Sequence, residues 1–133
     1  MPFVNLKLVK GQTTLEQREN IITGLTDLIV NIMGRERDLT VITMDELNAN
    51  QWAIGGKTVD QFGSNRKVSF VNIKISKGTS NPEEMARMMK QTKELMVDIL
   101  GNSEETNYFV IEELNPDAWG FGGIPMTTRN RQS

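Results

Sequence analysis

The chain has 133 residues, 38% of them hydrophobic, which is enough for one compact domain or for two small halves that share a core. It contains neither cysteine nor histidine, which excludes thiol nucleophiles, serine–histidine–aspartate triads and most zinc sites. The formal net charge of -2, spread over both signs, argues against nucleic acid as a partner, and without a long apolar run or a signal-peptide pattern we expect a soluble cytoplasmic protein that does not bind membranes.

The first predicted element is an apolar strand over residues 3–8, and Pro2 stands directly before it. If Met1 is removed, which the small Pro2 side chain permits, the new terminal nitrogen is a secondary amine and therefore a base, whereas the nitrogen of an internal proline is an amide. A terminus tied into a sheet can hold this amine in a pocket, where burial and nearby cations lower its pKa from about 8 toward neutrality. Such a base suits proton transfer. A Met-Pro start is also common in proteins that make no use of it.

The sequence repeats itself after 67 residues without a gap, which indicates a tandem duplication of a unit of about sixty residues. The matching residues include Phe3, Val4, Asn5, Trp52, Gly55 and Gly56 in the first copy and Phe70, Val71, Asn72, Trp119, Gly122 and Gly123 in the second. We therefore expect a first unit at residues 1–60, a polar linker at 61–67 and a second unit at 68–133.

Each unit is predicted to be a strand, a helix and a second strand. Capping-box spacing starts the helices, at Thr13 with Glu16 and at Ser80 with Glu83, and apolar residues then recur every three or four positions. The helices are expected to end at Gly34 and Gly101. Their methionines are interpreted as core residues. The second strands follow, from Leu39 to Leu47 and from Tyr108 to Leu114, and the glycine pairs at 55–56 and 122–123 mark hairpins that could reach a neighbouring molecule.

Two strands joined through a helix are normally parallel, with a right-handed crossover. Two such units predict an α+β fold, a four-stranded sheet with two helices on one face. Because the helices leave the other face of the sheet bare, we expect association with further copies of the chain.

The combination of Pro2, the run Phe3-Val4-Asn5-Leu6-Lys7 and the close Trp52-x-Ile54-Gly55-Gly56 resembles the 4-oxalocrotonate tautomerase group of the tautomerase superfamily. The resemblance covers nearly the whole chain twice. It implies a fused, two-unit member with a tautomerase/MIF-like fold and a homotrimer that mimics six units.

The resemblance implies that Pro2 is the catalytic general base, which moves a proton between an enol or dienol and its ketone without a cofactor or metal. The second unit has Ser69 at this position. Its nitrogen is an internal amide, so we expect that unit to have lost proton transfer and to serve a structural or pocket-lining role.

In the family, arginines hold the carboxylates of a typically dicarboxylic substrate. This chain departs from the pattern, because the corresponding positions hold the uncharged residues Gln12, Thr79, Val41 and Tyr108. The nearest candidates for substrate binding are Arg35, Arg37 and Lys10. The two arginines could instead lie in a solvated loop with Glu36 and Asp38 as partners.

Further candidates are aromatic or charged. The resemblance implies that an aromatic residue from the paired unit walls the pocket, so Trp119 is expected to cover the Pro2 site and Trp52 the Ser69 site, although either could belong to the core. Glu46 and Glu113 could activate water, as acidic residues do in hydrating members of the superfamily. Arg129 and Arg131 could add cations, but we expect a disordered tail there.

The sequence thus predicts a cofactor-independent tautomerase that uses Pro2 on an unsaturated 2-hydroxy or 2-oxo carboxylate such as 2-hydroxymuconate. Two alternatives remain open. The same base could serve a hydratase or dehalogenase of 3-haloacrylates, or the chain could be a catalytically idle structural trimer.

Overall fold

A computed structural model describes residues 1–63 and 66–132, except for the side chains of residues 130–132. Ser64 and Asn65 of the predicted linker, and the side chain of Arg131, therefore lie outside the described part. The elements follow in the order β1 (Phe3–Val9), α1 (Leu15–Met33), η1 (Arg37–Leu39), β2 (Val41–Leu47), η2 (Ala49–Gln51), β3 (Ala53–Ile54), β4 (Lys57–Thr58), η3 (Val59–Gln61), β5 (Ser69–Ser76), α2 (Pro82–Leu100), β6 (Phe109–Leu114), β7 (Gly120–Phe121), β8 (Ile124–Pro125) and α3 (Met126–Gln132).

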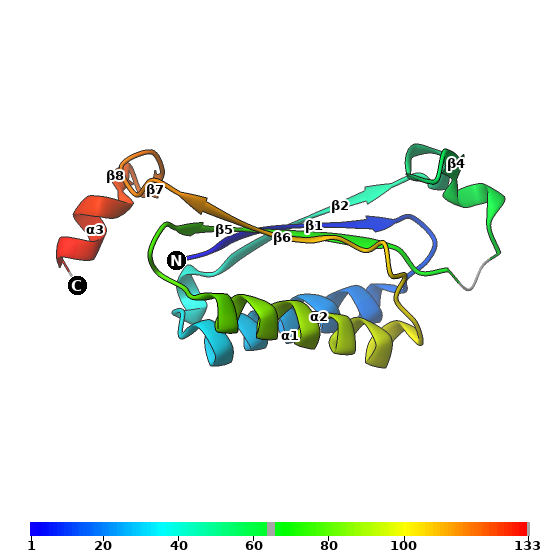
Figure 1. Ribbon diagram of the computed structural model, residues 1–133, viewed down its shortest axis with the longest axis horizontal. Coiled ribbons are helices and arrows are strands. Elements are labelled where there is room, and N and C mark those ends of the chain that lie inside the picture. The colour runs from blue at the N-terminus through cyan, green and yellow to red at the C-terminus, as the bar shows by residue number, and fades with distance from the viewer. Residues whose placement is uncertain (64–65, 133) are drawn as a thin grey trace.

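The main sheet has four strands in the order β2-β1-β5-β6, and α1 and α2 lie side by side on one of its faces (Figure 1). Within each unit the strands are parallel, β1 with β2 and β5 with β6. The units meet through the antiparallel pair β1 and β5, in which Phe3 lies opposite Lys74 and Leu8 opposite Ser69. The predicted α+β architecture is confirmed. Because this pairing is antiparallel, the start of β1 lies beside the end of β5, and the start of β5 lies beside the end of β1.

The two long helices start at equivalent residues, one position later than predicted. Thr14, not Thr13, caps α1 and forms a capping box with Gln17, while the Asn81 side chain, not Ser80, accepts from the backbone of α2. Asparagine directly before a proline is a strong signal for a helix start, since proline fits the first helical position. In both helices the cap is therefore the residue that follows the predicted one. Gly34 and Gly101 end the helices in left-handed conformations, as predicted.

The second strands are shorter than predicted at their starts. Leu39 belongs to the short helix η1, so β2 begins at Val41, and β6 begins at Phe109 instead of Tyr108. The predicted hairpins are confirmed as β3-β4 and β7-β8. The tail prediction was wrong, because residues 126–132 form the helix α3, and Arg129 donates to the Phe121 carbonyl and lies over its ring.

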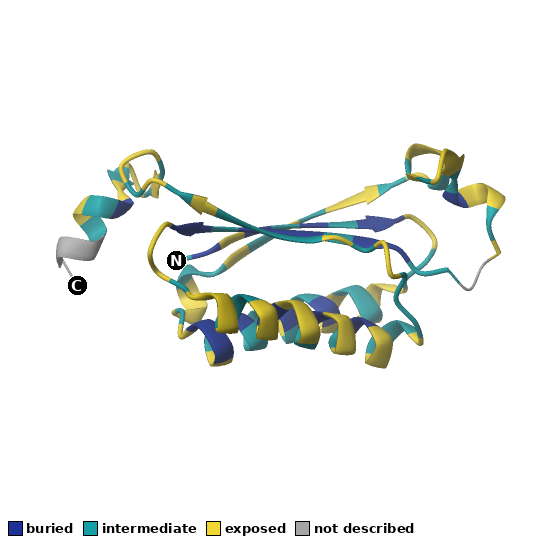
Figure 2. Cartoon of the chain, viewed as in Figure 1, coloured by how far each residue is buried: buried dark blue, intermediate teal, exposed yellow. Residues whose placement is uncertain are grey.

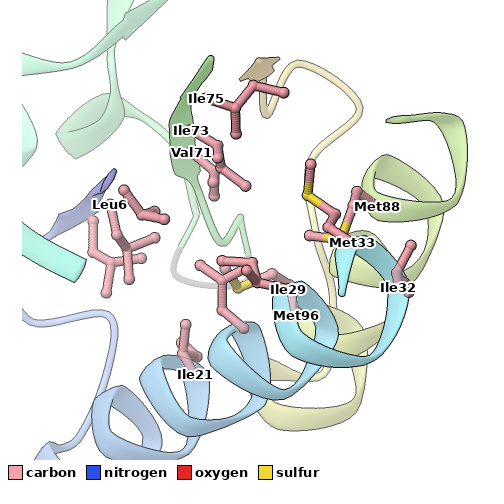
Figure 3. Packing of buried hydrophobic residues seen from close by; sticks show 13 residues of the cluster. Leu6, Ile21, Ile29, Ile32, Met33, Val71, Ile73, Ile75, Met88 and Met96 are labelled. Carbon is pink, nitrogen blue, oxygen red and sulfur yellow. The ribbon is translucent and has the colours of Figure 1, made fainter. Parts of the chain in front are cut away.

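The core lies between the sheet and the two helices (Figures 2 and 3). Alternate residues of β1 and β5 point into it, and α1 and α2 supply the opposing layer, with Ile29 and Met96 facing each other across the helices. Each such side chain contributes about 1.5–3 kcal/mol by its burial. Met88 and Met96 are core residues, as predicted, whereas Met89 remains 42% exposed.

The opposite face of the sheet carries polar residues along its middle and the exposed apolar residues Phe3 and Val41 at the Pro2 end. On it Asn5 and Lys7 of β1 bond to Asp45 of β2, and in the second unit Asn72 donates to Glu112. No helix of the described chain covers this face (Figure 1).

Candidate functional site

Pro2 lies at the end of the sheet where β1 starts. Its side chain is buried, and its carbonyl oxygen accepts a hydrogen bond from the Val41 backbone at 3.4 Å. The chain start is therefore part of the sheet and not a frayed end. The end of β5 and the loop that follows it lie at this same end of the sheet, as do β7, β8 and α3 (Figure 1).

Arg35 comes from the loop after α1 and crosses to the second unit. Its Nη2 donates to the carbonyl oxygen and to the hydroxyl of Thr79, at 2.7 and 3.0 Å. Its Nε is buried and has no hydrogen-bond partner among the described residues. The guanidinium is thus held by Thr79 at the Pro2 end of the sheet, with Glu84 as a nearby opposite charge.

The amine of the chain start lies in the field of Arg35. In the structure this amine belongs to Met1, and its pKa lies below the ordinary value, first because of burial and second because of the Arg35 guanidinium, while Glu36 opposes the shift. An amine at this edge is thus biased toward its neutral, basic form.

The two tryptophans lie at opposite ends of the sheet. The Trp119 indole donates to Ser76 Oγ at 3.0 Å, at the end of β5 on the Pro2 edge. Trp52 packs instead in a small cluster with Val9, Val59 and Val68 at the other end. The difference follows the repeat, since Ser76 is the counterpart of Val9, and a hydroxyl there gives the second indole a polar partner.

Two further predicted site residues lie away from Pro2. Lys10 follows the end of β1, where its backbone donates to Leu47, so it lies at the Ser69 end of the sheet. At that end Trp52, Ser69 and Tyr108 line an open pocket of about 580 Å³. Within one chain, the structure therefore groups Pro2 with Arg35 and Trp119, and Ser69 with Trp52 and Lys10.

The family model described as Tautomerase enzyme matches this chain twice, over residues 2–61 and 70–129. The chain belongs to the tautomerase family.

Relatives and solved structures agree with this tautomerase assignment. Probable tautomerase K2 of Dickeya dadantii is 39% identical over 61 residues, which are 46% of this chain and 91% of the relative. The 2-hydroxymuconate tautomerase of Bacillus subtilis is 28% identical over 57 residues, 43% of this chain and 90% of the relative. Both are thus the size of one unit.

Two-unit proteins share the whole fold. The structure of a native fused 4-OT superposes with a TM-score of 0.86 at 16% identity, covering 97% of this chain and 99% of the other. A second fused 4-OT, a symmetric trimer, gives 0.82 at 16% identity with the same coverage. The chain is therefore a two-unit tautomerase with the fold of the fused 4-OT proteins.

Other charged candidates of this tautomerase have partners of their own. Arg37 is half exposed and forms an ion pair with Asp27 of α1. The neighbours Glu36 and Asp38, expected from the sequence, do not take this role. Glu46 pairs with Arg18 at 3.0 Å near the end of β2, at the far edge from Pro2.

Thr79 and Ser76 were not singled out as site residues. Thr79 occupies a position where the family resemblance implies an arginine, yet here it holds Arg35 in place. Only the antiparallel pairing of β1 with β5 brings Arg35 and Thr79 together, and no local sequence pattern predicts that pairing. Among the described residues no acidic cluster suits a metal ion, and no described helix is long and apolar enough to cross a membrane.

Proposed function

We propose that this tautomerase interconverts the enol and keto forms of an unsaturated 2-hydroxy or 2-oxo carboxylate such as 2-hydroxymuconate, with the amine of Pro2 as the general base. The proposal requires removal of Met1. The family match that begins at residue 2 supports a chain whose functional start is Pro2.

The lowered pKa of the amine at the chain start supports the role of a base. Burial and Arg35 both act on the Met1 amine, and after Met1 is removed the Pro2 amine lies one residue closer to the buried start of β1. Its neutral form is then more populated near neutral pH than that of an ordinary terminal amine, which suits a general base.

The guanidinium of Arg35, close enough to act on the amine of the chain start, is the observation that carries the substrate class. Thr79 holds the Nη2 side of the guanidinium, so the side chain is oriented before the substrate arrives. A carboxylate or 2-oxo group that accepts from this guanidinium gains a charge-assisted hydrogen bond. The name of the Bacillus subtilis relative supports 2-hydroxymuconate as the first substrate to test.

In the proposed reaction the Pro2 amine takes the proton of the enol hydroxyl, the oxygen becomes a carbonyl, and the protonated amine returns a proton to a carbon of the conjugated system. No electrons leave the substrate, so the step needs no cofactor. Arg35 stabilises the negative charge that develops on the oxygen. Trp119, held by Ser76, excludes water from this edge.

The Pro2→Ala variant tests the proposal. We expect its kcat for 2-hydroxymuconate to fall about 10²–10⁴-fold, because a positioned general base contributes that much. The assay follows the ultraviolet absorbance of the dienol. Intact mass must first show that Met1 is absent from the wild-type protein, and circular dichroism must show that the variant is folded.

Equal turnover in the Pro2→Ala variant would overturn the proposal, as would a retained Met1 in a fully active enzyme. Halide release from a 3-haloacrylate, without turnover of the dienol, would assign the same base to a dehalogenase. No turnover of either substrate by a processed wild-type chain would favour the idle structural trimer.

A further inference from the structure

Two charged residues at the Pro2 end of the sheet have no charged counterpart at the other end. Arg35 follows α1 and Glu84 lies in the first turn of α2, both near the chain start (Figure 1). The repeat places Asn102 at the position of Arg35 and Gln17 at the position of Glu84. The guanidinium and the carboxylate therefore occur together at one end of the sheet, and neutral amides take both positions at the other.

Neighbouring residues of the segment before α2 hold the two charged side chains. Arg35 Nη2 donates to the carbonyl and the hydroxyl of Thr79, at 2.7 and 3.0 Å. The hydroxyl of the next residue, Ser80, donates to Glu84 Oε1 at 2.9 Å. Because Thr79 and Ser80 are adjacent in the chain, the guanidinium and the carboxylate are brought close together at the start of α2.

The Glu84 carboxylate acts on the guanidinium by its charge. Burial lowers the pKa of Arg35, and the negative charge of Glu84 opposes this shift. Glu84 is partly buried, whereas the preceding residue, Glu83, is exposed. Glu84 thus offsets part of the positive potential that a carboxylate approaching Arg35 would meet, and exposed Glu83 is screened by solvent.

We propose that Glu84 sets the affinity of the carboxylate site, because its negative charge weakens the attraction of Arg35 for the bound substrate and product alike. This inference rests on the proposed role of Arg35 in substrate binding. Glu84 acts through Arg35 and is not a catalytic residue. An effect that is equal in the bound substrate and in the transition state changes KM and leaves kcat the same.

Calorimetric titration of the full-length protein with adipate tests the inference. Adipate has the chain length and both carboxylates of 2-hydroxymuconate but has no enol, so it binds without reacting. Glu84→Gln, which restores the amide of the first unit, should bind adipate about three- to ten-fold more tightly than the wild type does. Glu83→Gln is the matched control, because it makes the same change of charge in the same helical turn, and it should bind adipate like the wild type.

The Arg35→Ala background shows whether Glu84 acts through the guanidinium. There Glu84→Gln should leave adipate binding unchanged, since the charge that it offsets is gone. With 2-hydroxymuconate as substrate, Glu84→Gln should lower KM by the same factor as it lowers the dissociation constant of adipate. Its kcat should remain that of the wild type.

Equal adipate affinity in Glu84→Gln and Glu83→Gln would overturn the inference. So would weaker binding in Glu84→Gln, which would mean that the carboxylate orients the guanidinium, or an equal gain of affinity without Arg35. A wild-type protein that binds no adipate would overturn it as well. If the variants bind as expected but the processed protein does not turn over 2-hydroxymuconate, the proposed reaction fails and the role of Glu84 stands.

Discussion

Arg35 belongs to the first unit, but the second unit decides where its guanidinium lies. Thr79 accepts two hydrogen bonds from Nη2, while the buried Nε has no partner in the part of the chain that the structure describes. The same guanidinium lowers the pKa of the amine at the chain start. One side chain is thus placed to act on both the proposed base and the proposed substrate.

Replacing Arg35 by alanine should move the pH profile of the enzyme. Because the cation lowers the pKa of the terminal amine, its loss raises that pKa, and the amine then stays protonated up to a higher pH. The acidic limb of kcat/KM should therefore shift to higher pH, and kcat/KM above the limb should fall about 10- to 100-fold through the lost charged hydrogen bond.

The lysine variant separates these two effects of Arg35. Arg35→Lys keeps the positive charge but loses the planar donor pair, so the acidic limb should stay near that of the wild type while KM rises. An alanine variant whose limb does not move would show that Arg35 does not face the base.

Arg37→Ala should change kcat/KM much less than Arg35→Ala, because Arg37 pairs with Asp27. Steady-state kinetics of the two variants under the same conditions checks this. Equal losses would mean that both arginines bind the substrate and that the orientation given by Thr79 is unimportant.

The sequence alone could not separate Arg35 from Arg37. Both stand in the loop before the second strand, and both have acidic neighbours. What separates them is the turn of α1 that brings Asp27 to Arg37, and the strand pairing that brings Thr79 to Arg35. The role proposed for Pro2, in contrast, rests on its position alone, because only a terminal proline can have a basic nitrogen.

At the scale of the elements, the helix starts show how the repeat constrains the local structure. Thr14 and Asn81 occupy equivalent positions and both accept from the helix backbone three residues on. Different cap residues therefore preserve the same start in both units.

Asn81→Ala should lower the free energy of unfolding by about 1 kcal/mol, as the loss of a helix cap does. Ser80→Ala should cost less, because the Ser80 hydroxyl donates to the Glu84 carboxylate and caps no backbone group. Urea unfolding at one fixed protein concentration measures both, which matters for a chain that associates. If Ser80→Ala lowered the free energy of unfolding more than Asn81→Ala, Ser80 would be the helix cap, as the sequence had predicted.

Elements with strong periodicity were predictable, and those fixed by tertiary contacts were not. The helices and inner strands follow from apolar spacing and from the glycines at 34 and 101. The helix α3 lies in a polar tail that carries no such spacing. There Arg129 packs over Phe121 and bonds to its carbonyl, a contact that depends on the preceding hairpin.

At the scale of the whole molecule, the sheet leaves two strand edges unpaired within the described chain, those of β2 and β6. Free edges invite further strands, and the hairpins β3-β4 and β7-β8 project beyond the sheet at its two ends (Figure 1). We propose a homotrimer in which these edges and hairpins meet, as supported by the fused 4-OT structure described as a symmetric trimer.

Light scattering on the purified protein should therefore give three times the chain mass of 15.0 kDa. The value should hold on dilution through the concentration range of the assay. A mass of one chain under active conditions would contradict the trimer and would require each proposed site to be complete within one molecule.

The duplication and the four-stranded sheet could be predicted because Phe3 and Phe70 mark one register that continues to Trp52 and Trp119. The direction in which β1 and β5 pair could not be predicted from the sequence. Parallel and antiparallel contacts between β1 and β5 satisfy the same apolar pattern, since both bury alternate residues such as Leu6 and Ile73.

That antiparallel contact makes the two halves of the gene product mutually dependent. The first half contributes the proline and the guanidinium, but the threonine that orients the guanidinium and the indole nearest to it belong to the second. A first unit by itself would keep the proposed base and Arg35 but would lose the threonine that orients Arg35.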